Sequence, residues 1–293
     1  MKKKLENSLE QLIIIVRSWI KMVNEKEINN FFNSQKPIIG MLHLKPLPGS
    51  PVYNNEGLAP IIKHVLDEAR KLVKGGVDAL EIENYNDPSY FPDCAPAETT
   101  AAMAIIANEV KKAYPEVTLG VCVLADPISS IAVAHSSGAK FIRATFFTEA
   151  SVDVSGLALR RPHEILRYRK FLDPSIKIFA DVHIKHSAPL ANRPIEESAY
   201  DAAYFLADAV ILSGKHTGYE TPLEDVKKVR KVLPKFPIFI GSGTNKNNVS
   251  ELLKYASGAI VGTSFKNNGK SENDIEEYKV KNFMKIIERI RNK

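Results

Sequence analysis

The chain has 293 residues, of which 44% are hydrophobic and 25% charged, and its formal net charge is +6. This composition is typical of an ordinary globular protein and excludes a chain that is disordered throughout. Basic and acidic residues are interspersed, as in the stretch 223–230, so they form no basic stripe of the kind that binds nucleic acid. We therefore expect the anionic partner to be a small phosphorylated metabolite rather than DNA or RNA.

The first 35 residues carry an apolar pattern with helical spacing. Hydrophobic side chains recur every three or four positions from Leu5 to Val23, which predicts an amphipathic helical extension over residues 1–35. Its apolar run is too short for a secretory signal, and no segment has the roughly 18 apolar residues of a membrane-spanning helix. Three roles stay open for this extension: packing under a barrel, contact with a partner subunit, and peripheral contact with a membrane. Packing is the expected role.

The chain contains two cysteines, Cys94 and Cys122. Two cysteines are too few for a disulfide framework, and Cys122 lies in an apolar run that predicts a buried strand. We therefore expect a reducing compartment, the cytoplasm, and we expect the protein to form a homo-oligomer there.

From residue 36 onward, short apolar runs alternate with amphipathic stretches through eight rounds. Strands are predicted at 37–44, 77–84, 118–124, 140–146, 176–183, 207–213, 237–241 and 259–263. Helices are predicted at 61–74, 98–113, 127–136, 161–170, 196–206, 223–233, 247–255 and 275–290. Eight such units predict the α/β class and a single (β/α)8 barrel over residues 36–293.

An open, doubly wound sheet is the structural alternative to this barrel. Such a fold would place a Gly-x-Gly-x-x-Gly motif after its first strand, and the sequence has none there. The closed barrel is therefore favoured, and no nucleotide cofactor is expected.

Polar residues occur near the ends of the predicted strands, where the loops of a parallel barrel form its active site. In the fifth strand, Asp181, His183 and Lys185 alternate with apolar residues and would share the inward face while the strand stays extended. A carboxylate, an imidazole and an amine in one barrel mouth could act as acid, base and electrostatic stabiliser. The alternative is a structural polar network that fills the barrel centre.

The second and fourth strands add charged residues on the same face. Glu81 and Glu83 alternate with apolar neighbours, and two inward carboxylates need a compensating cation, a bound metal or a raised pKa. Arg143 of the fourth strand is the predicted cation, with Glu81 as its structural partner and Glu83 as a site residue. His43, at the end of the first strand, is a further candidate. A divalent metal is left open, with Glu83, Asp181 and His183 as candidate ligands.

Glycine-containing turns follow the sixth, seventh and eighth strands. Because (β/α)8 barrels often bind phosphate at the loops after strands seven and eight, these turns predict an anion site. The alternative is that the glycines only permit tight turns. The candidate phosphate-binding residues are Ser213, Gly214, Gly241, Ser242, Gly243, Gly262 and Thr263.

The combination of these motifs resembles the BtpA/SgcQ family of (β/α)8 proteins. The resemblance is carried by the segment 39–51, by Glu83-Asn84 with Asp87-Pro88 and Tyr90, by the segment 180–186, and by the two glycine turns at 241–243 and 260–264. It covers the chain from about residue 36, and Glu81 stands where we would expect an aliphatic residue in this family. The resemblance implies a barrel related to phosphate-binding metabolic enzymes. One branch of the family is named for photosystem I biogenesis, and another is associated with bacterial sugar uptake.

Two functions therefore remain as hypotheses. The first is an enzyme that acts on a small phosphorylated sugar or related metabolite by acid/base or aldol-type chemistry, with phosphate at the glycine turns. The second is a non-catalytic assembly or stability factor whose N-terminal extension contacts a partner or a membrane.

Overall fold

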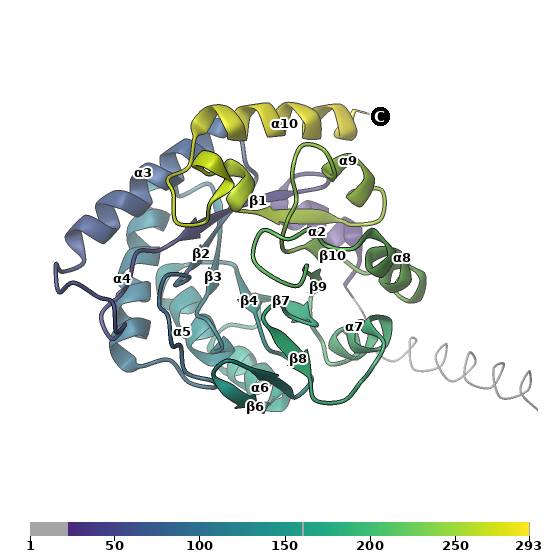
Figure 1. Ribbon diagram of the computed structural model, residues 1–293, viewed down its shortest axis with the longest axis horizontal. Helices are drawn as coiled ribbons and strands as arrows, with labels where there is room; N and C mark the ends of the chain where they lie inside the picture. The colour runs from purple at the N-terminus through teal and green to yellow at the C-terminus, as the bar shows by residue number, and fades with distance from the viewer. Residues whose placement is uncertain (1–22, 160, 293) are drawn as a thin grey trace, which may run out of the picture.

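Eight parallel strands close into a barrel in the order β1-β11-β10-β9-β7-β4-β3-β2 (Figure 1). This computed structural model describes residues 23–159 and 161–292. The strands are β1 (Ile38–His43), β2 (Ala79–Glu83), β3 (Thr118–Cys122), β4 (Phe141–Ala144), β7 (Lys177–Val182), β9 (Ala209–Leu212), β10 (Ile238–Ile240) and β11 (Gly258–Val261). The predicted (β/α)8 fold is confirmed, with all eight strands at the predicted places.

Helices alternate with these strands and surround the barrel. They are α3 (Ala59–Gly75), α4 (Ala97–Ala113), α5 (Pro127–Ser137), α6 (Pro162–Leu172), α7 (Ile195–Tyr204), α8 (Leu223–Val232), α9 (Val249–Leu252) and α10 (Glu277–Arg291), and two short 3-10 turns, η1 (Thr263–Phe265) and η2 (Asn267–Gly269), precede α10. The barrel strands are almost wholly buried, because helices cover their outer face and other side chains fill the interior. Figure 1 shows α10 beside α3, so the last helix packs against the first one of the barrel.

The helix α2 (Glu25–Phe32) closes the amino-terminal end of the barrel. Its Phe32 ring lies 5.8 to 6.1 Å from the rings of Phe141, Phe179 and Phe239, which point inward from β4, β7 and β10. Ile28 is also fully buried in this cluster. The described part of the extension therefore packs under the barrel, whereas the predicted helix from Leu5 onward lies almost entirely outside the described residues.

A small antiparallel sheet lies outside the barrel, in the order β6-β5-β8. Its strands, β5 (Ser151–Asp153), β6 (Gly156–Ala158) and β8 (Ser187–Pro189), come from the segments that follow β4 and β7. Since these segments leave the carboxyl ends of their strands, the sheet lies at the rim of the barrel mouth. Strands of three residues carry too little alternation for a sequence pattern to predict them.

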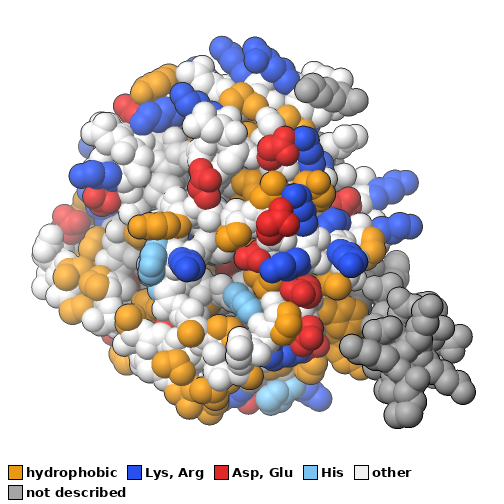
Figure 2. Space-filling model, turned by 45° about the vertical axis from the view of Figure 1, so that its right-hand side comes forward, with side chains coloured by type: hydrophobic (Ala, Val, Ile, Leu, Met, Phe, Trp, Pro, Cys, Tyr) orange, Lys and Arg blue, Asp and Glu red, His pale blue; other side chains and the backbone are white. Residues whose placement is uncertain are grey.

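The described surface bears charges of both signs. On the face shown in Figure 2, Lys and Arg side chains lie among Asp and Glu side chains rather than in a separate area. Among residues 23–159 and 161–292, no helix is both long and apolar enough to cross a membrane.

Candidate active site at the barrel mouth

The inward side chains of the barrel are apolar at the amino-terminal end and polar at the carboxyl ends of the strands. Near the amino-terminal end they are apolar and form one cluster with α2. One layer further along the strands, the register places His43 beside Glu83, and Glu83 beside Cys122. Arg143 and Asp181 complete this layer from β4 and β7, so the polar residues gather at the carboxyl ends of the strands, as predicted.

Arg143 and Asp181 form a buried, bidentate ion pair. The Arg143 Nε and Nη2 atoms donate to the two Asp181 oxygens at 2.7 and 2.9 Å. Glu81 lies further from the guanidinium, with 3.8 Å between Arg143 Nη1 and Glu81 Oε1. The predicted pairing of Glu81 with Arg143 is present as this longer contact, but Asp181 takes the hydrogen bonds of the guanidinium. Both Asp181 oxygens accept a hydrogen bond from the guanidinium.

Glu81 is a fully buried carboxyl without a hydrogen-bond partner among the described residues. Burial raises its pKa to about 8, and the lowering effect of Arg143 is smaller because that cation is shared with Asp181. The neighbouring Glu83 and Asp181 carboxylates raise the Glu81 pKa further. At neutral pH, Glu81 is therefore expected to be protonated, which relieves the repulsion between the inward carboxyl groups.

Glu83 and His43 lie next to each other at the mouth. The distance between Glu83 Oε2 and His43 Nε2 is 3.7 Å, which is too long for a hydrogen bond. The His43 ring stacks on Tyr85 with 4.3 Å between ring centroids. Burial and the positive charges of Lys266 and Lys185 hold the His43 pKa well below its ordinary value, so His43 is neutral.

Lys185 lines the mouth together with Glu83 and Arg143, whereas His183 lines a neighbouring cavity of about 1030 Å3 that also reaches Lys185 and Ser213. The strand β7 ends at Val182, and His183 adopts a positive φ of 47°. Its ring faces outward from the barrel centre, with Nε2 at 3.1 Å from Ser198 Oγ on α7. The predicted shared face of Asp181, His183 and Lys185 is therefore wrong for His183, because the chain is no longer extended there.

The Lys185 side chain is half-buried, and its surroundings change its pKa. Burial and the nearby Arg143 guanidinium lower the Lys185 pKa, while the Glu83 and Asp181 carboxylates oppose the shift. A larger fraction of the amine is thus neutral than in a solvated lysine, which favours both proton acceptance and nucleophilic attack.

The predicted glycine turns surround a small cavity beside these charged groups. Its wall includes the segments 241–244 and 260–263, with His43, Glu83 and Lys185 on the other side. Gly243 has a φ of 68°, and a Cβ atom there would lie 2.2 Å from the Tyr219 carbonyl oxygen, so only glycine fits. A Cβ atom on Gly241 would lie 2.7 Å from Ser213 Oγ.

Gly214 and Ser242 hold the turn of strand β9 against that of β10. The Gly214 N–H donates to Ser242 Oγ at 2.8 Å, and Ser242 Oγ donates to the Tyr219 carbonyl at 3.1 Å. Gly214 and Ser242 therefore have structural bonds within the cavity wall. Gly262 and Thr263 line the cavity from the β11 turn, and Gly262 lies beside His43.

Several buried polar atoms at the mouth have no hydrogen-bond partner among the described residues. They are His43 Nδ1, both oxygens of Glu81, Glu83 Oε2, Ser213 Oγ and Thr244 Oγ1. Each such atom costs about 1 to 3 kcal/mol when it stays unsatisfied, and native proteins contain few of them. All of them project from the strands or turns that form one cavity and the layer below it, which indicates a site for a polar ligand.

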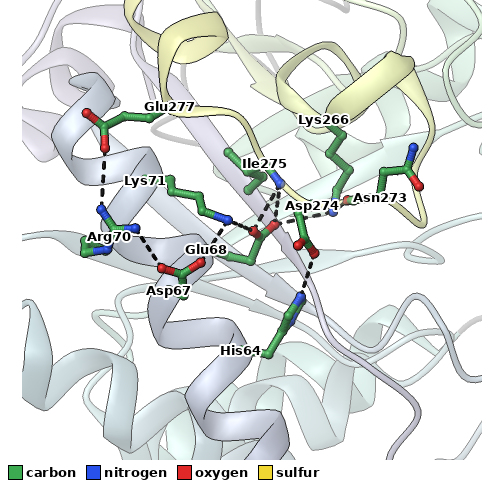
Figure 3. A network of polar contacts seen from close by, with 10 residues as sticks. All are labelled: His64, Asp67, Glu68, Arg70, Lys71, Lys266, Asn273, Asp274, Ile275 and Glu277. Atoms are coloured by element: carbon green, nitrogen blue, oxygen red, sulfur yellow. Dashed lines mark hydrogen bonds and ion pairs between the residues drawn. The ribbon is translucent and has the colours of Figure 1, made fainter.

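The candidate metal ligands Glu83, Asp181 and His183 do not come together. Within the described residues, the one group of three potential ligands is His64, Glu68 and Asp274, outside the barrel. Figure 3 shows that Glu68 in this group already accepts from Lys71 and the Ile275 N–H, and it faces Lys266. Two ammonium groups on one carboxylate disfavour a cation there, so neither cluster fits a resident metal.

Other residues of the site follow no pattern in the sequence. Tyr85, Thr217 and Gly218 contribute to the mouth, but no strand pattern identified them. Thr244, a hydroxyl residue of the turn after the seventh predicted strand, also lines the mouth. Thr217 and Gly218 come from a loop whose approach to the mouth depends on long-range contacts.

The fold and the mouth define a (β/α)8 barrel protein with a polar, glycine-lined site at the carboxyl ends of its strands. The sequence model of the BtpA family matches residues 34–289, and the chain belongs to this family. An uncharacterized protein of Archaeoglobus fulgidus is 40% identical over 236 residues, which are 80% of this chain and 93% of the relative. The photosystem I biogenesis protein BtpA of Synechocystis is 34% identical over 258 residues, 87% of this chain and 89% of the relative.

Solved structures of other barrels are similar in fold at low sequence identity. The N-acetylmannosamine-6-phosphate 2-epimerase of Clostridium perfringens aligns with a TM-score of 0.52 at 13% identity, over 86% of this chain and 93% of that one. The (S)-3-O-geranylgeranylglyceryl phosphate synthase of Thermoplasma acidophilum, with sn-glycerol-1-phosphate, aligns with a TM-score of 0.53 at 13% identity, over 93% and 100%. These similarities show the fold.

Proposed function

We propose that the protein is an enzyme that binds a small phosphorylated sugar or related metabolite at the barrel mouth. The observation that carries this proposal is the set of unpaired buried polar atoms around the glycine-lined cavity. A scaffold gains nothing from keeping His43, Glu83, Ser213 and Thr244 desolvated and unpaired, whereas a ligand that supplies their partners recovers the cost.

In this proposal, the glycine turns hold the phosphate. The segments 241–244 and 260–263 bring backbone close to the cavity. The Thr244 hydroxyl, in the cavity wall, and the Ser213 hydroxyl, beside Gly241, can donate to phosphate oxygens. Lys185 adds a positive charge from the opposite wall. The phosphate would then fix the rest of the substrate against Glu83 and Lys185.

Glu83 and Lys185 are the proposed groups for proton transfer. The lowered pKa of Lys185 increases the fraction of neutral amine, which can accept a proton next to a carbonyl or add to that carbonyl as in an aldolase. Glu83 has an unpaired oxygen to exchange a proton with the substrate, and the Arg143–Asp181 pair holds the floor of the site. His43 is a neutral hydrogen-bonding group in this arrangement.

The neighbouring solved barrels support the choice of substrate class. The names of the Clostridium perfringens epimerase and the Thermoplasma acidophilum synthase both include a phosphorylated compound. A shared fold does not carry a reaction across, so the proposal rests on this chain's own mouth.

Calorimetric titration with a panel of sugar phosphates and the same sugars without phosphate tests the proposal. At least one phosphorylated compound should bind, and Gly243→Ala should weaken it about tenfold or more, because the added methyl group displaces the turn. The matched control is Gly269→Ala, which has a similar φ of 65° but open space around it. Absence of binding by every phosphorylated compound, or equal binding by both variants, would reject the proposal.

An assembly factor is the second candidate, favoured by the name of the Synechocystis relative. In this case residues 1–22 would contact a partner protein, a second copy or a membrane surface. Deletion of residues 1–22 tests it and keeps α2, whose Ile28 and Phe32 pack under the barrel. An assembly factor of this kind should lose co-sedimentation with its partner or with membranes, while the proposed enzyme should keep its ligand affinity.

A further inference from the structure

A second cavity, of about 250 Å3, adjoins the glycine-lined one. The two cavities share Glu83, Arg143, Lys185 and Thr217 as wall residues. A ligand whose phosphate lies at the glycine turns would therefore pass Glu83 and Lys185 and continue into the second cavity, which we call the side chamber.

The wall of the side chamber is mainly apolar. Side chains from the segments after β2, β3, β4 and β7 form it, among them Tyr85, Tyr90, Leu124, Phe146, Val154 and Ile184. Apolar and aromatic surface of this kind binds apolar groups by removing their surface from water.

Apart from the residues shared with the glycine-lined cavity, polar side chains of the chamber wall are paired within the protein. The Asp87 carboxylate accepts from the Leu47 N–H at 2.8 Å and from Asn84 Nδ2 at 3.2 Å. Thr145 Oγ1 accepts from the Ala125 N–H at 3.2 Å. Sugar hydroxyls in the chamber would have to compete with these bonds, and a buried hydroxyl without a partner is costly.

The two tyrosine hydroxyls are also directed to protein partners. Tyr85 Oη lies 3.3 Å from Ser271 Oγ, and Tyr90 Oη donates to Asp153 at 3.5 Å. The tyrosines thus offer the chamber ring surface rather than free hydroxyls. The polar side chains contrast with the glycine-lined cavity next to them, where Thr244 has an unpaired hydroxyl.

We propose that the substrate is a phosphate monoester that carries a compact apolar group, aryl or alkyl, in the side chamber. This inference rests on the proposed function, because it takes the phosphate at the glycine turns as its starting point. The chamber volume corresponds to roughly eight water-sized groups, and the apolar group has about that size. Any hydroxyl or carbonyl of the substrate lies at the junction between the cavities, beside Glu83 and Lys185.

A series of straight-chain alkyl phosphates from methyl to octyl, titrated by calorimetry, tests the inference. Affinity should increase about fourfold with each added methylene until the chamber is full, and then level off. Glycerol 3-phosphate and ribose 5-phosphate serve as polar ligands of similar length, and the alkyl ligands should bind at least tenfold tighter than these.

Two variants and a matched control locate the effect. Leu124→Asn places an amide in the chamber wall and should reduce the affinity gained with each added methylene. The affinity for methyl phosphate should stay unchanged. Val154→Asn, at a residue that is 90% exposed and therefore tolerant, should reduce the dependence for the longer chains. The control is Val152→Asn on the same small sheet, since Val152 does not line the chamber. It should behave as the wild type.

The outcomes separate this inference from the proposed function. If the polar phosphates bind but the alkyl chain adds no affinity, the apolar substrate class is wrong and the phosphate site stands. A chain-length dependence that Leu124→Asn and Val154→Asn leave unchanged also overturns the inference. If no phosphorylated compound binds, the proposed function fails, and this inference fails with it.

Discussion

Glu68 and Glu83 are both buried glutamates, with 3% and 1% of their surface exposed, but their surroundings are opposite. The Glu68 carboxylate accepts from Lys71 Nζ and from the Ile275 N–H, each at 3.0 Å, and Lys266 Nζ lies 3.7 Å away (Figure 3). Glu83 has an unpaired oxygen, which lies 3.7 Å from Nε2 of the neutral His43 imidazole.

The difference shows how to separate a structural carboxylate from a functional one. The Glu68 network joins α3 to the segment before α10, so its polar groups satisfy one another and hold the barrel closed. The mouth around Glu83 keeps polar atoms unpaired at a cost in stability, which is typical of a site that awaits a ligand. The predictions below test this contrast.

The largest effect on stability is expected for Glu68→Ala. Lys266 is only 3% exposed, and removal of Glu68 leaves its ammonium group buried without a carboxylate. The free energy of unfolding, measured by denaturant titration, should fall by about 3 to 5 kcal/mol. The matched control is Asp67→Ala one residue earlier, whose half-exposed ion pairs with Arg70 and Lys71 are worth about 1 kcal/mol or less. Equal losses in both variants would contradict the structural role of Glu68.

The next effect concerns Glu81 and the pH dependence of stability. Because its pKa is raised to about 8 in the folded protein, the folded state binds more protons than the unfolded state above pH 4.5. Its contribution to stability is therefore complete below about pH 4.5 and is lost as the pH rises toward 8. The free energy of unfolding of the wild type should fall by roughly 3 kcal/mol between pH 4.5 and pH 7. Glu81→Gln should abolish this loss, so the variant should be the more stable protein at pH 7.

Chemical denaturation from pH 4.5 to 8 measures this dependence. The control is Glu224→Gln, which neutralises an exposed glutamate on α8 and should follow the wild-type profile. Parallel profiles for wild type and Glu81→Gln would mean that Glu81 is ionised in the folded state.

Glu83→Gln should separate stability from activity. The variant removes an incompletely paired buried carboxylate, so the free energy of unfolding should change by no more than about 1 kcal/mol. Exchange of the proton next to the carbonyl of a bound sugar phosphate, followed by NMR in D2O, should slow at least about a hundredfold. A large loss of stability with unchanged exchange would place Glu83 among the structural carboxylates, like Glu68.

The smallest effect on stability is expected for Ser213→Ala. The Ser213 hydroxyl is unpaired, so its removal should not lower the free energy of unfolding, while phosphate affinity falls. The neighbouring Ser242→Ala removes a hydroxyl that bonds to Gly214 and Tyr219, and it should cost about 1 to 3 kcal/mol. If both variants are equally stable, the distinction between paired and unpaired groups at the mouth does not hold.

The fold could be predicted from the sequence because local patterns of apolar residues indicate each strand and helix. Strands buried on both faces are continuous apolar runs, and the helices between them carry one apolar side, so each unit could be recognised separately. The strand-end rule then predicted His43, Glu83 and Arg143 at the mouth, where the structure has them.

The rest of the site could not be predicted, because the alternation of polar and apolar residues does not show where a strand ends or which inward side chains contact each other. His183 leaves the inward face because β7 ends at Val182 and His183 itself has a positive φ. Its ring then contacts Ser198 on α7. Glu81 and Asp181 both point inward, and only the distances show that Asp181 is the partner of Arg143. The short strands of the rim sheet and the loop with Thr217 likewise take their positions from tertiary contacts.

A crystal structure of the protein soaked with a sugar phosphate tests the central claim most directly. The account predicts a phosphate in the glycine-lined cavity, within hydrogen-bond distance of Ser213 Oγ and Thr244 Oγ1, with the rest of the ligand against Glu83 and Lys185. A phosphate bound elsewhere, with no ligand atom within hydrogen-bond distance of Ser213 or Thr244, would contradict the assignment of the mouth as a phosphate-binding active site.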